Sequence, residues 1–223
     1  MTTFPGSPRL IKGGLVLLAP DTGTVMRVIA FQYNPDSLSR TLQVQGVGAE
    51  SGDRVEAFRL KGPPVETIKL DAEIDATDQL GQSQPDTIAT QVGILPELAA
   101  LELIVYPPAA KLQQDITLAQ GGSLEIIPAE EPLTLLVWSA NRVMPVRLTE
   151  FTVTEEMFDV ALNPIRAKIS LGARVLSVND LPSGHRGTGL YLGYQQRKET
   201  LAAQRGSTAL TTLGIQQITG GAS

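Results

Sequence analysis

The stretch TIKLDAEI, residues 67–74, alternates apolar and polar side chains without a break, and this alternation decides the fold class. The two sets fall on opposite faces of an extended chain: Ile68, Leu70, Ala72 and Ile74 on one, Thr67, Lys69, Asp71 and Glu73 on the other. Residues 165–178 repeat the pattern, with Arg166, Lys168 and Arg174 among the polar members. Strands with one buried and one solvated face are typical of antiparallel sheets, so a mainly β protein is predicted.

Further strands are predicted at residues 25–33, 38–45, 133–139 and 142–153. The first is apolar on both faces, which predicts a position inside a sheet. The Asn34-Pro35-Asp36 turn would join it to the second strand as a hairpin. Pro145 predicts that the strand over 142–153 is bulged or lies at an edge.

The spacing of apolar residues predicts one helix over residues 95–105, with Pro96 in its first turn and Pro107-Pro108 after its end. A short polar helix is predicted at 191–204, while 46–64 and 111–123 read as connections. These elements predict a two-sheet β sandwich or barrel with one packed α-helix and a short C-terminal helix. The expected organisation is an N-terminal arm over 1–24, a β domain over 25–180 and a C-terminal extension over 181–223.

The composition excludes several classes of site. The 223 residues include no cysteine and a single histidine, His185, so disulfides, thiol chemistry and metal sites with several histidines are excluded. A net charge of −5 argues against nucleic acid as the main partner. No apolar run approaches the ~18 residues that cross a bilayer, and the first residues have no signal-peptide pattern. We therefore expect folding in the cytoplasm, no membrane insertion and no cofactor.

Two features could suggest an enzyme or a carbohydrate-binding module. Glu155, Glu156 and Asp159 could form paired carboxylates for acid–base catalysis, but no other mark of a glycosidase cleft accompanies them. The three acids are instead predicted to contact a basic patch on another subunit. Trp138 is predicted to lie in the core rather than to form a sugar platform, because aromatic residues total only 4%. His185 is predicted to lie in a surface loop, and no enzymatic activity is expected.

Several stretches carry a family resemblance: FQYNPDSLSR (31–40), LDAEIDATD (70–78), LPELAALELIVYPP (95–108), the segment 135–177, and YQQRKETLA (194–202). They resemble the tube-domain proteins of bacterial contractile injection systems. That family includes the component that caps the central spike and starts or adapts the inner tube. The resemblance covers most of residues 25–203 and is most specific at FQYNP (31–35) and TEEMFDVALNPIRA (154–167). Relatives often carry a C-terminal LysM-type domain, and no such module is recognised in this sequence.

The resemblance implies a two-sheet β fold with a helix on one side, six copies of which form a ring. The implied function is a structural baseplate subunit that joins the central spike to the inner tube and templates tube assembly. Its partners would be sister copies in a homo-hexameric ring, a trimeric spike protein, inner tube proteins and other baseplate subunits. The particle would be phage-tail-like and would assemble in the bacterial cytoplasm. The alternatives are an inner tube or other baseplate component and, from another class, a β-sandwich carbohydrate-binding module.

Three groups of residues are predicted to contact partner subunits. They are Phe31, Tyr33, Asn34 and Pro35 at the turn; Lys69, Asp71, Glu73, Arg166, Lys168 and Arg174 on the polar strand faces; and Glu155, Glu156 and Asp159 in the acidic stretch. A ring that pairs strands between chains satisfies their open edges, and the polar faces would then line a lumen or a subunit boundary. The alternatives are a hairpin with packed aromatics for the first group and an ordinary solvated sheet face for the second.

Overall fold

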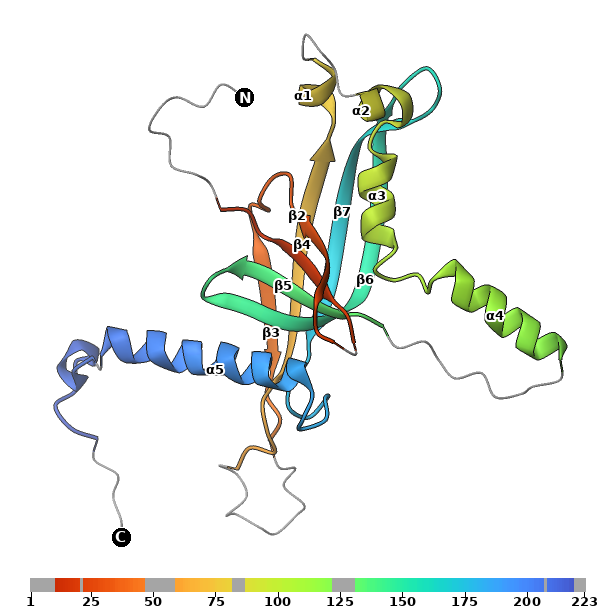
Figure 1. Ribbon diagram of the computed structural model, residues 1–223. Coiled ribbons are helices and arrows are strands. Elements are labelled where there is room, and N and C mark those ends of the chain that lie inside the picture. The colour runs from red at the N-terminus through yellow and green to blue at the C-terminus, as the bar shows by residue number, and fades with distance from the viewer. Residues whose placement is uncertain are drawn as a thin grey trace.

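A computed structural model describes residues 11–20, 22–46, 59–81, 87–121, 131–206 and 208–218 (Figure 1). These residues form one antiparallel sheet of seven strands in the order β2-β1-β5-β6-β7-β4-β3. The strands are β1 (Gly14–Leu18), β2 (Val25–Ala30), β3 (Leu38–Gln43), β4 (Val65–Asp75), β5 (Leu133–Ser139), β6 (Arg142–Phe158) and β7 (Pro164–Val175). The prediction of a mainly β protein is confirmed.

The described residues form one sheet where two were predicted, and β6 explains the difference. This 17-residue strand pairs with β5 through residues 142–146 and with β7 from Val146 to Phe158. One uninterrupted strand therefore carries the hydrogen-bond ladder from one half of the sheet to the other. The two-sheet arrangement is not confirmed.

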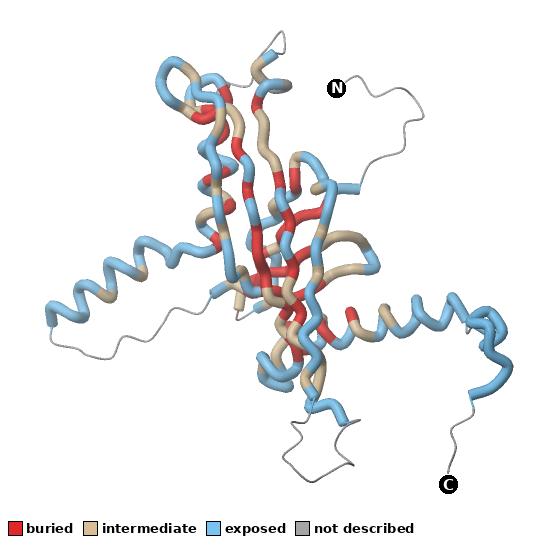
Figure 2. Tube along the Cα trace, turned by 180° about the vertical axis from the view of Figure 1, so that it is seen from behind, coloured by how far each residue is buried: buried red, intermediate tan, exposed pale blue. Residues whose placement is uncertain are grey.

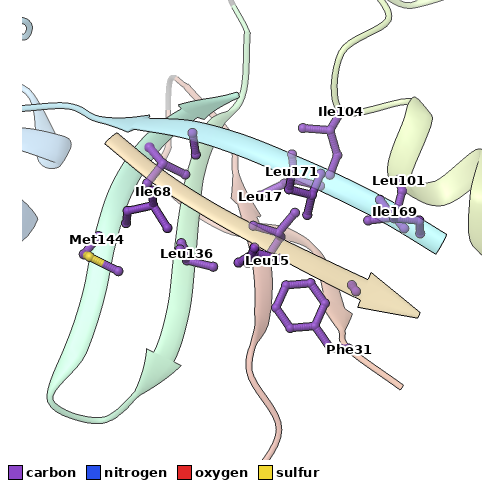
Figure 3. Close-up of a cluster of buried hydrophobic side chains, with 14 of the residues drawn as sticks. Leu15, Leu17, Phe31, Ile68, Leu101, Ile104, Leu136, Met144, Ile169 and Leu171 are labelled. Atoms are coloured by element: carbon purple, nitrogen blue, oxygen red, sulfur yellow. The ribbon is translucent and has the colours of Figure 1, made fainter. Parts of the chain in front are cut away.

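The hydrophobic core lies against the apolar face of β4 and β7, as the alternation predicts. Figure 3 shows side chains of β1, β4, β5, β6 and β7 gathered there with Phe31. Leu15, Ile68 and Ile169 are at most 1% exposed. Leu15 belongs to β1, which lies between β2 and β5, so residues 14–18 belong to the sheet although an arm over 1–24 was predicted. The sequence GLVLL is buried on both faces and has no polar alternation that could have marked it as a strand.

The predicted hairpin between residues 25–33 and 38–45 is wrong. β2 pairs with β1, β3 pairs with β4, and the two lie at opposite ends of the sheet. The chain crosses between them because Phe31 is buried in the core and the Gln32 side chain is hydrogen-bonded to the backbone of Asp75. The interior position predicted for 25–33 is also wrong, since Met26 and Val28 on the outermost strand are 60% and 63% exposed.

Pro145 lies in the middle of the sheet, so the structure excludes the edge position, one of the two alternatives predicted for its strand. It is buried opposite Leu135 of β5, and its carbonyl accepts a hydrogen bond from Leu176 N at 2.8 Å on the other side. The backbone nitrogen points to that same side, away from β5, so proline removes no β5–β6 hydrogen bond. The predicted bulge is confirmed, because the β6–β7 register shifts between Leu148 and Glu150.

The helices are α1 (Thr77–Leu80), α2 (Thr87–Val92), α3 (Leu95–Glu102), α4 (Ala109–Gln120) and α5 (Arg186–Arg205), followed by a 3₁₀ turn, η2 (Leu210–Leu213). The predicted helix is confirmed as α3, with Pro96 in its first turn and Leu98 and Leu101 in the core. α4 forms where a connection was predicted, and α5 begins at Arg186 rather than at residue 191. Both project from the sheet, and only the first turns of α5 are buried (Figures 1 and 2).

Candidate interaction surfaces

A polar face extends over β4, β7 and β6. The register places its residues in cross-strand rows: Lys69–Gly172–Glu150, Asp71–Ser170–Thr152, Glu73–Lys168–Thr154 and Asp75–Arg166–Glu156. Thr67, Arg174 and Arg147 form a further row at one end. Side chains two residues apart in a strand share a face, so all six charged residues predicted on the polar faces of these strands are brought together.

Gly172 separates the two charged residues of the row Lys69–Gly172–Glu150. Lys69 Nζ donates to Glu150 Oε2 at 2.8 Å across the position where Gly172 has no side chain. A Cβ atom at residue 172 would lie 2.8 Å from the Cβ of Glu150, closer than van der Waals contact allows. The hydrogen bond to Glu150 and the charge of that carboxylate raise the pKa of Lys69. Both side chains are more than half exposed, so the pair is a surface feature.

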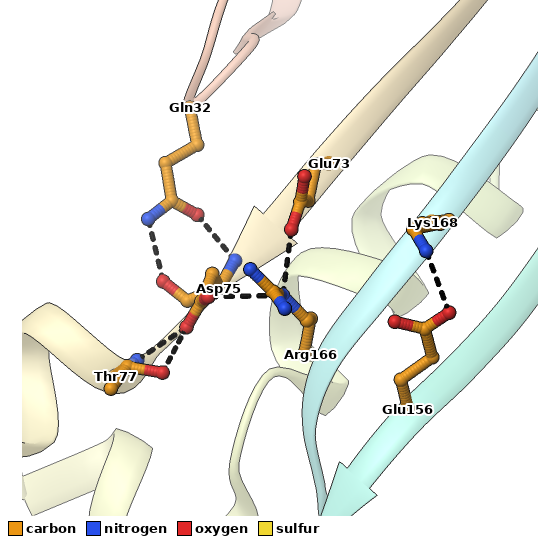
Figure 4. Close-up of polar contacts among 7 residues, drawn as sticks. All are labelled: Gln32, Glu73, Asp75, Thr77, Glu156, Arg166 and Lys168. Atoms are coloured by element: carbon orange, nitrogen blue, oxygen red, sulfur yellow. Dashed lines mark hydrogen bonds and ion pairs between the residues drawn. The ribbon is translucent and has the colours of Figure 1, made fainter.

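Arg166 and Lys168 of the polar face are also paired with carboxylates (Figure 4). Arg166 Nε lies 2.6 Å from Glu73 Oε1 and 3.1 Å from Asp75 Oδ2, and Lys168 Nζ donates to Glu156 Oε1 at 3.0 Å. Away from these, the Ser170 hydroxyl donates to Asp71, and Arg174 donates to Asp180. The surface is therefore hydrated and balanced in charge, without the basic excess that binds nucleic acid.

A glutamine closes the upper end of this face. Gln32 Nε2 donates to the backbone carbonyl of Asp75 at 2.6 Å, and Asp75 N donates to Gln32 Oε1 at 2.9 Å. The amide thus replaces a neighbouring strand beyond the end of β3. Burial raises the pKa of the Asp75 carboxyl, but hydrogen bonds from Thr77 and the charge of Arg166 outweigh it and leave that pKa below its ordinary value.

The turn at residues 31–35 is mainly structural. Phe31 is buried in the core, and the Asn34 side chain binds both Ile11 O and Gly13 N at 2.9 Å, which holds the chain entering β1. Pro35 is half-buried. Tyr33 is 40% exposed. The partner contact predicted for this group stays a prediction, and Tyr33 is the side chain available for it.

The acidic stretch does not form paired carboxylates. Glu155 and Glu156 are consecutive residues of β6 and point to opposite faces of the sheet. Asp159 closes the β6–β7 turn by accepting hydrogen bonds from Ala161 N, Asn163 N and Asn163 Nδ2 at 2.7–2.9 Å. Hydrogen bonds from Asn163 and Ala161 lower the pKa of the Asp159 carboxyl. The predicted contact of these acids with another subunit is not tested by this geometry.

A buried charged cluster on the core side of β4 was missed from the sequence. Glu66 is 3% exposed and accepts hydrogen bonds from Arg40 Nε at 2.7 Å, Tyr194 Oη at 3.0 Å and Lys198 Nζ at 3.4 Å. The Lys198 ammonium also lies 3.9 Å from the centre of the Tyr194 ring. Burial and the charge of Glu66 raise the pKa of Tyr194 to about 12. This cluster, the Glu66 anchor, joins α5 to β3 and β4.

The remaining single residues have structural roles. Trp138 is half-buried against the core with Gly13 on its ring, so it presents no exposed sugar platform. His185 Nδ1 accepts from Gly187 N at 3.0 Å and caps α5. Among the residues described, no group of three or more His, Cys, Asp or Glu side chains is placed to hold a metal ion. No helix in the described part of the chain has the length and apolar character to cross a bilayer.

No protein-family model matches the chain, and no curated protein matches it. Among solved structures, it is similar to one described as "Tail of empty GTA particle computed with helical refinement, C6 symmetry". The two share 11% identity, and the match covers 74% of this chain and 90% of that chain with a TM-score of 0.30.

Proposed function

We propose that this chain is a non-catalytic structural subunit of a phage-tail-like contractile particle. Six copies form a ring that joins a trimeric spike to the inner tube, contacts other baseplate subunits and is assembled in the bacterial cytoplasm. The sequence resemblance of residues 25–203 to tube-domain proteins of contractile injection systems supports this proposal. The structure adds support of a different kind, through the two ends of its sheet.

The observation that carries the proposal is the position of the two outermost strands. β2 and β3 lie at opposite ends of the sheet formed by the described residues. In this sheet each of the two has a neighbouring strand on one side only. Apolar side chains are exposed on both, such as Val28 and Leu42. Pairing one outer strand of a copy with the other outer strand of the next is a heterologous contact, which closes into a ring when the rotation fits.

The polar face supports the position of this sheet in a tube. A lumen through which protein or a spike passes needs a hydrated wall that holds no ligand tightly. The cross-strand pairs of Lys69 with Glu150 and of Lys168 with Glu156 leave a wall of that kind, with both signs interspersed.

The proposal is tested by imaging the full chain after co-expression with the spike and the first tube subunit. Negative-stain microscopy should show sixfold rings. Leu42→Lys in β3 should abolish them, because a lysine at the edge loses hydration when a strand pairs there. Leu192→Lys is the matched control, since Leu42 and Leu192 are 49% and 47% exposed. Strict monomers of the wild-type chain with these partners, or rings that survive Leu42→Lys, contradict the proposal.

A further inference from the structure

Helix α4 presents an apolar stripe to solvent. None of its residues is buried, and Leu112 and Ile116 lie four residues apart on one side of the helix, 47% and 52% exposed. A helix of 12 residues is marginal in water by itself, and this one projects from the sheet (Figures 1 and 2). Its stability therefore requires a surface against which the stripe can pack.

An apolar groove of about 560 Å³ lies at the root of α4, where α3 passes into the helix. Leu17 and Ile104 form its buried floor, while Met26, Leu103 and Tyr106 on its walls are 60%, 56% and 63% exposed. Large apolar side chains gathered around one concave surface mark an interaction site rather than scattered surface residues. The groove belongs to neither the polar face nor the Glu66 anchor.

The helix does not enter the groove of its own chain. Pro107 and Pro108 line the groove and lead directly into the helix, and Pro108 is extended, with φ −56° and ψ 136°. Two prolines fix the direction of the chain, so α4 leaves the groove without a linker that could turn it back. Figure 1 shows α4 pointing away from the sheet. A groove and a helix of matching character thus occur on one chain that cannot join them.

We infer that α4 of one copy lies in the groove of a neighbouring copy, with Leu112 and Ile116 against Leu103 and Tyr106. Charge supports a second copy as the occupant. α4 carries one cation and one anion, Lys111 and Asp115, which are paired at 2.7 Å, and the groove carries Arg27 and Glu131 at its margin. When α4 lies in the groove of a neighbouring copy, Lys111 can pair with Glu131 and Asp115 with Arg27 across the contact. The inference rests on the proposed function and deepens it by naming a second contact between ring neighbours, which adds a helix to the pairing of strand edges and adjoins β2 at Met26 and Arg27.

The absence of cysteine makes disulfide trapping a clean test. The full chain with Ile116→Cys and Leu103→Cys, co-expressed with the spike and the first tube subunit, should form disulfide-linked multimers on mild oxidation. The control pair, Gln114→Cys with Leu103→Cys, places one thiol on the opposite side of the helix and should stay monomeric. A disulfide within one chain, or the same multimers from the control, overturns the inference, as does the absence of any disulfide.

A second variant keeps the test independent of trapping. Ile116→Lys should weaken self-association at least about tenfold in sedimentation velocity, because an apolar side chain loses its burial. Gln114→Lys should leave self-association unchanged, and equal behaviour of the two variants contradicts the inference. Rings that form without trapped multimers would overturn this contact and leave the proposed function standing. Trapped multimers without rings or spike binding would overturn the proposed function alone.

Discussion

Strand β4 carries charge on both of its faces, and the two faces use it differently. On the solvent face, Lys69 and Glu73 pair with partners that are about one-third or more exposed, so water can replace each partner. On the core face, Glu66 is 3% exposed and depends on Arg40, Tyr194 and Lys198. The same Coulomb attraction is several times stronger where water is excluded. The buried charge therefore fixes a helix in place, while the exposed charges set the chemistry of a surface.

Removal of the buried carboxylate should produce the largest effect. In Glu66→Ala, Arg40 and Lys198 remain close together without their anion, and the free energy of unfolding should fall by about 3 kcal/mol. This is the lower end for a broken buried pair, because Arg40 and Lys198 are 27% and 35% exposed. Urea unfolding measures the loss. Trypsin should also cleave after Arg197 and Lys198 sooner, since α5 loses its attachment.

Glu150→Ala is the matched control for that prediction, because it removes a carboxylate from the solvent face of the same sheet. Its urea midpoint should stay close to that of the wild-type chain. If Glu66→Ala and Glu150→Ala destabilise the protein equally, the contrast between the two faces of β4 is wrong.

The second largest effect should come from Gly172→Ala, which tests the packing under the polar face. The new Cβ would lie 2.8 Å from the Cβ of Glu150, so backbone must move, at a cost of about 2 kcal/mol. The ordinary effect of replacing a strand glycine by alanine has the opposite sign, because alanine restricts the unfolded chain. Thermal unfolding that shows Gly172→Ala to be as stable as wild type would mean that β6 and β7 are not held this closely.

The alternation of residues 67–74 predicted which side chains of β4 face solvent, because period two is a local property of a strand. The Glu66 anchor could also have been found there, since Glu66 alternates in phase with Ile68 and Leu70 on the apolar face. The absence of the hairpin could not be predicted from nearby residues, because the Asn34-Pro35 turn is a valid hairpin signal. The burial of Phe31 and the hydrogen bonds between Gln32 and Asp75 direct the chain instead, and both are contacts with residues far away in the sequence. Strand order depends on such long-range pairs.

The helices show the same limit. α3 was predicted because its apolar residues pack on the sheet, and packing leaves a periodic pattern in the sequence. α4 buries none of its residues and so has little pattern beyond Leu112 and Ile116. α5 begins earlier than predicted because His185 caps it, a role that histidine takes less often than serine or aspartate. Several glycines in its first turns also obscured its start.

Gln32→Ala should have a smaller effect. It breaks the contact between Gln32, which follows β2, and Asp75 at the end of β4, and this contact is called the seam. Asp75 would lose partners for both its backbone N–H and its carbonyl, and the free energy of unfolding should fall by about 1.5 kcal/mol. Gln32→Glu should fall between wild type and Gln32→Ala, since a carboxylate can accept from the N–H but repels the carbonyl. Equal stability of all three proteins in urea would show that the glutamine does not hold the seam.

Tyr194→Phe should cost about 1 kcal/mol at neutral pH, because Glu66 and Arg40 each lose one hydrogen bond. The raised pKa also predicts a pH dependence. An unfolded tyrosine ionises near pH 10, whereas Tyr194 in the folded chain ionises near pH 12, so its contribution is complete below pH 10 and is lost as pH rises from 10 to 12. Unfolding midpoints measured across this window should fall less steeply in Tyr194→Phe. Parallel curves for the two proteins contradict this role.

The smallest effect belongs to Lys69→Gln on the solvent face, and it separates stability from assembly. Glu150 is 55% exposed, so water takes the place of the Lys69 ammonium beside it and the urea midpoint should not change measurably. The loss of Lys69 still leaves Glu150 without its cation on the polar face, where Lys168 and Glu156 remain paired. If that surface lines the lumen of the proposed ring, Lys69→Gln should form rings as wild type does. These rings should bind basic proteins more tightly than wild-type rings do at low salt, and the difference should shrink at high salt. A variant that unfolds more easily, or that forms no rings, would show that the pair serves the fold or the subunit boundary instead.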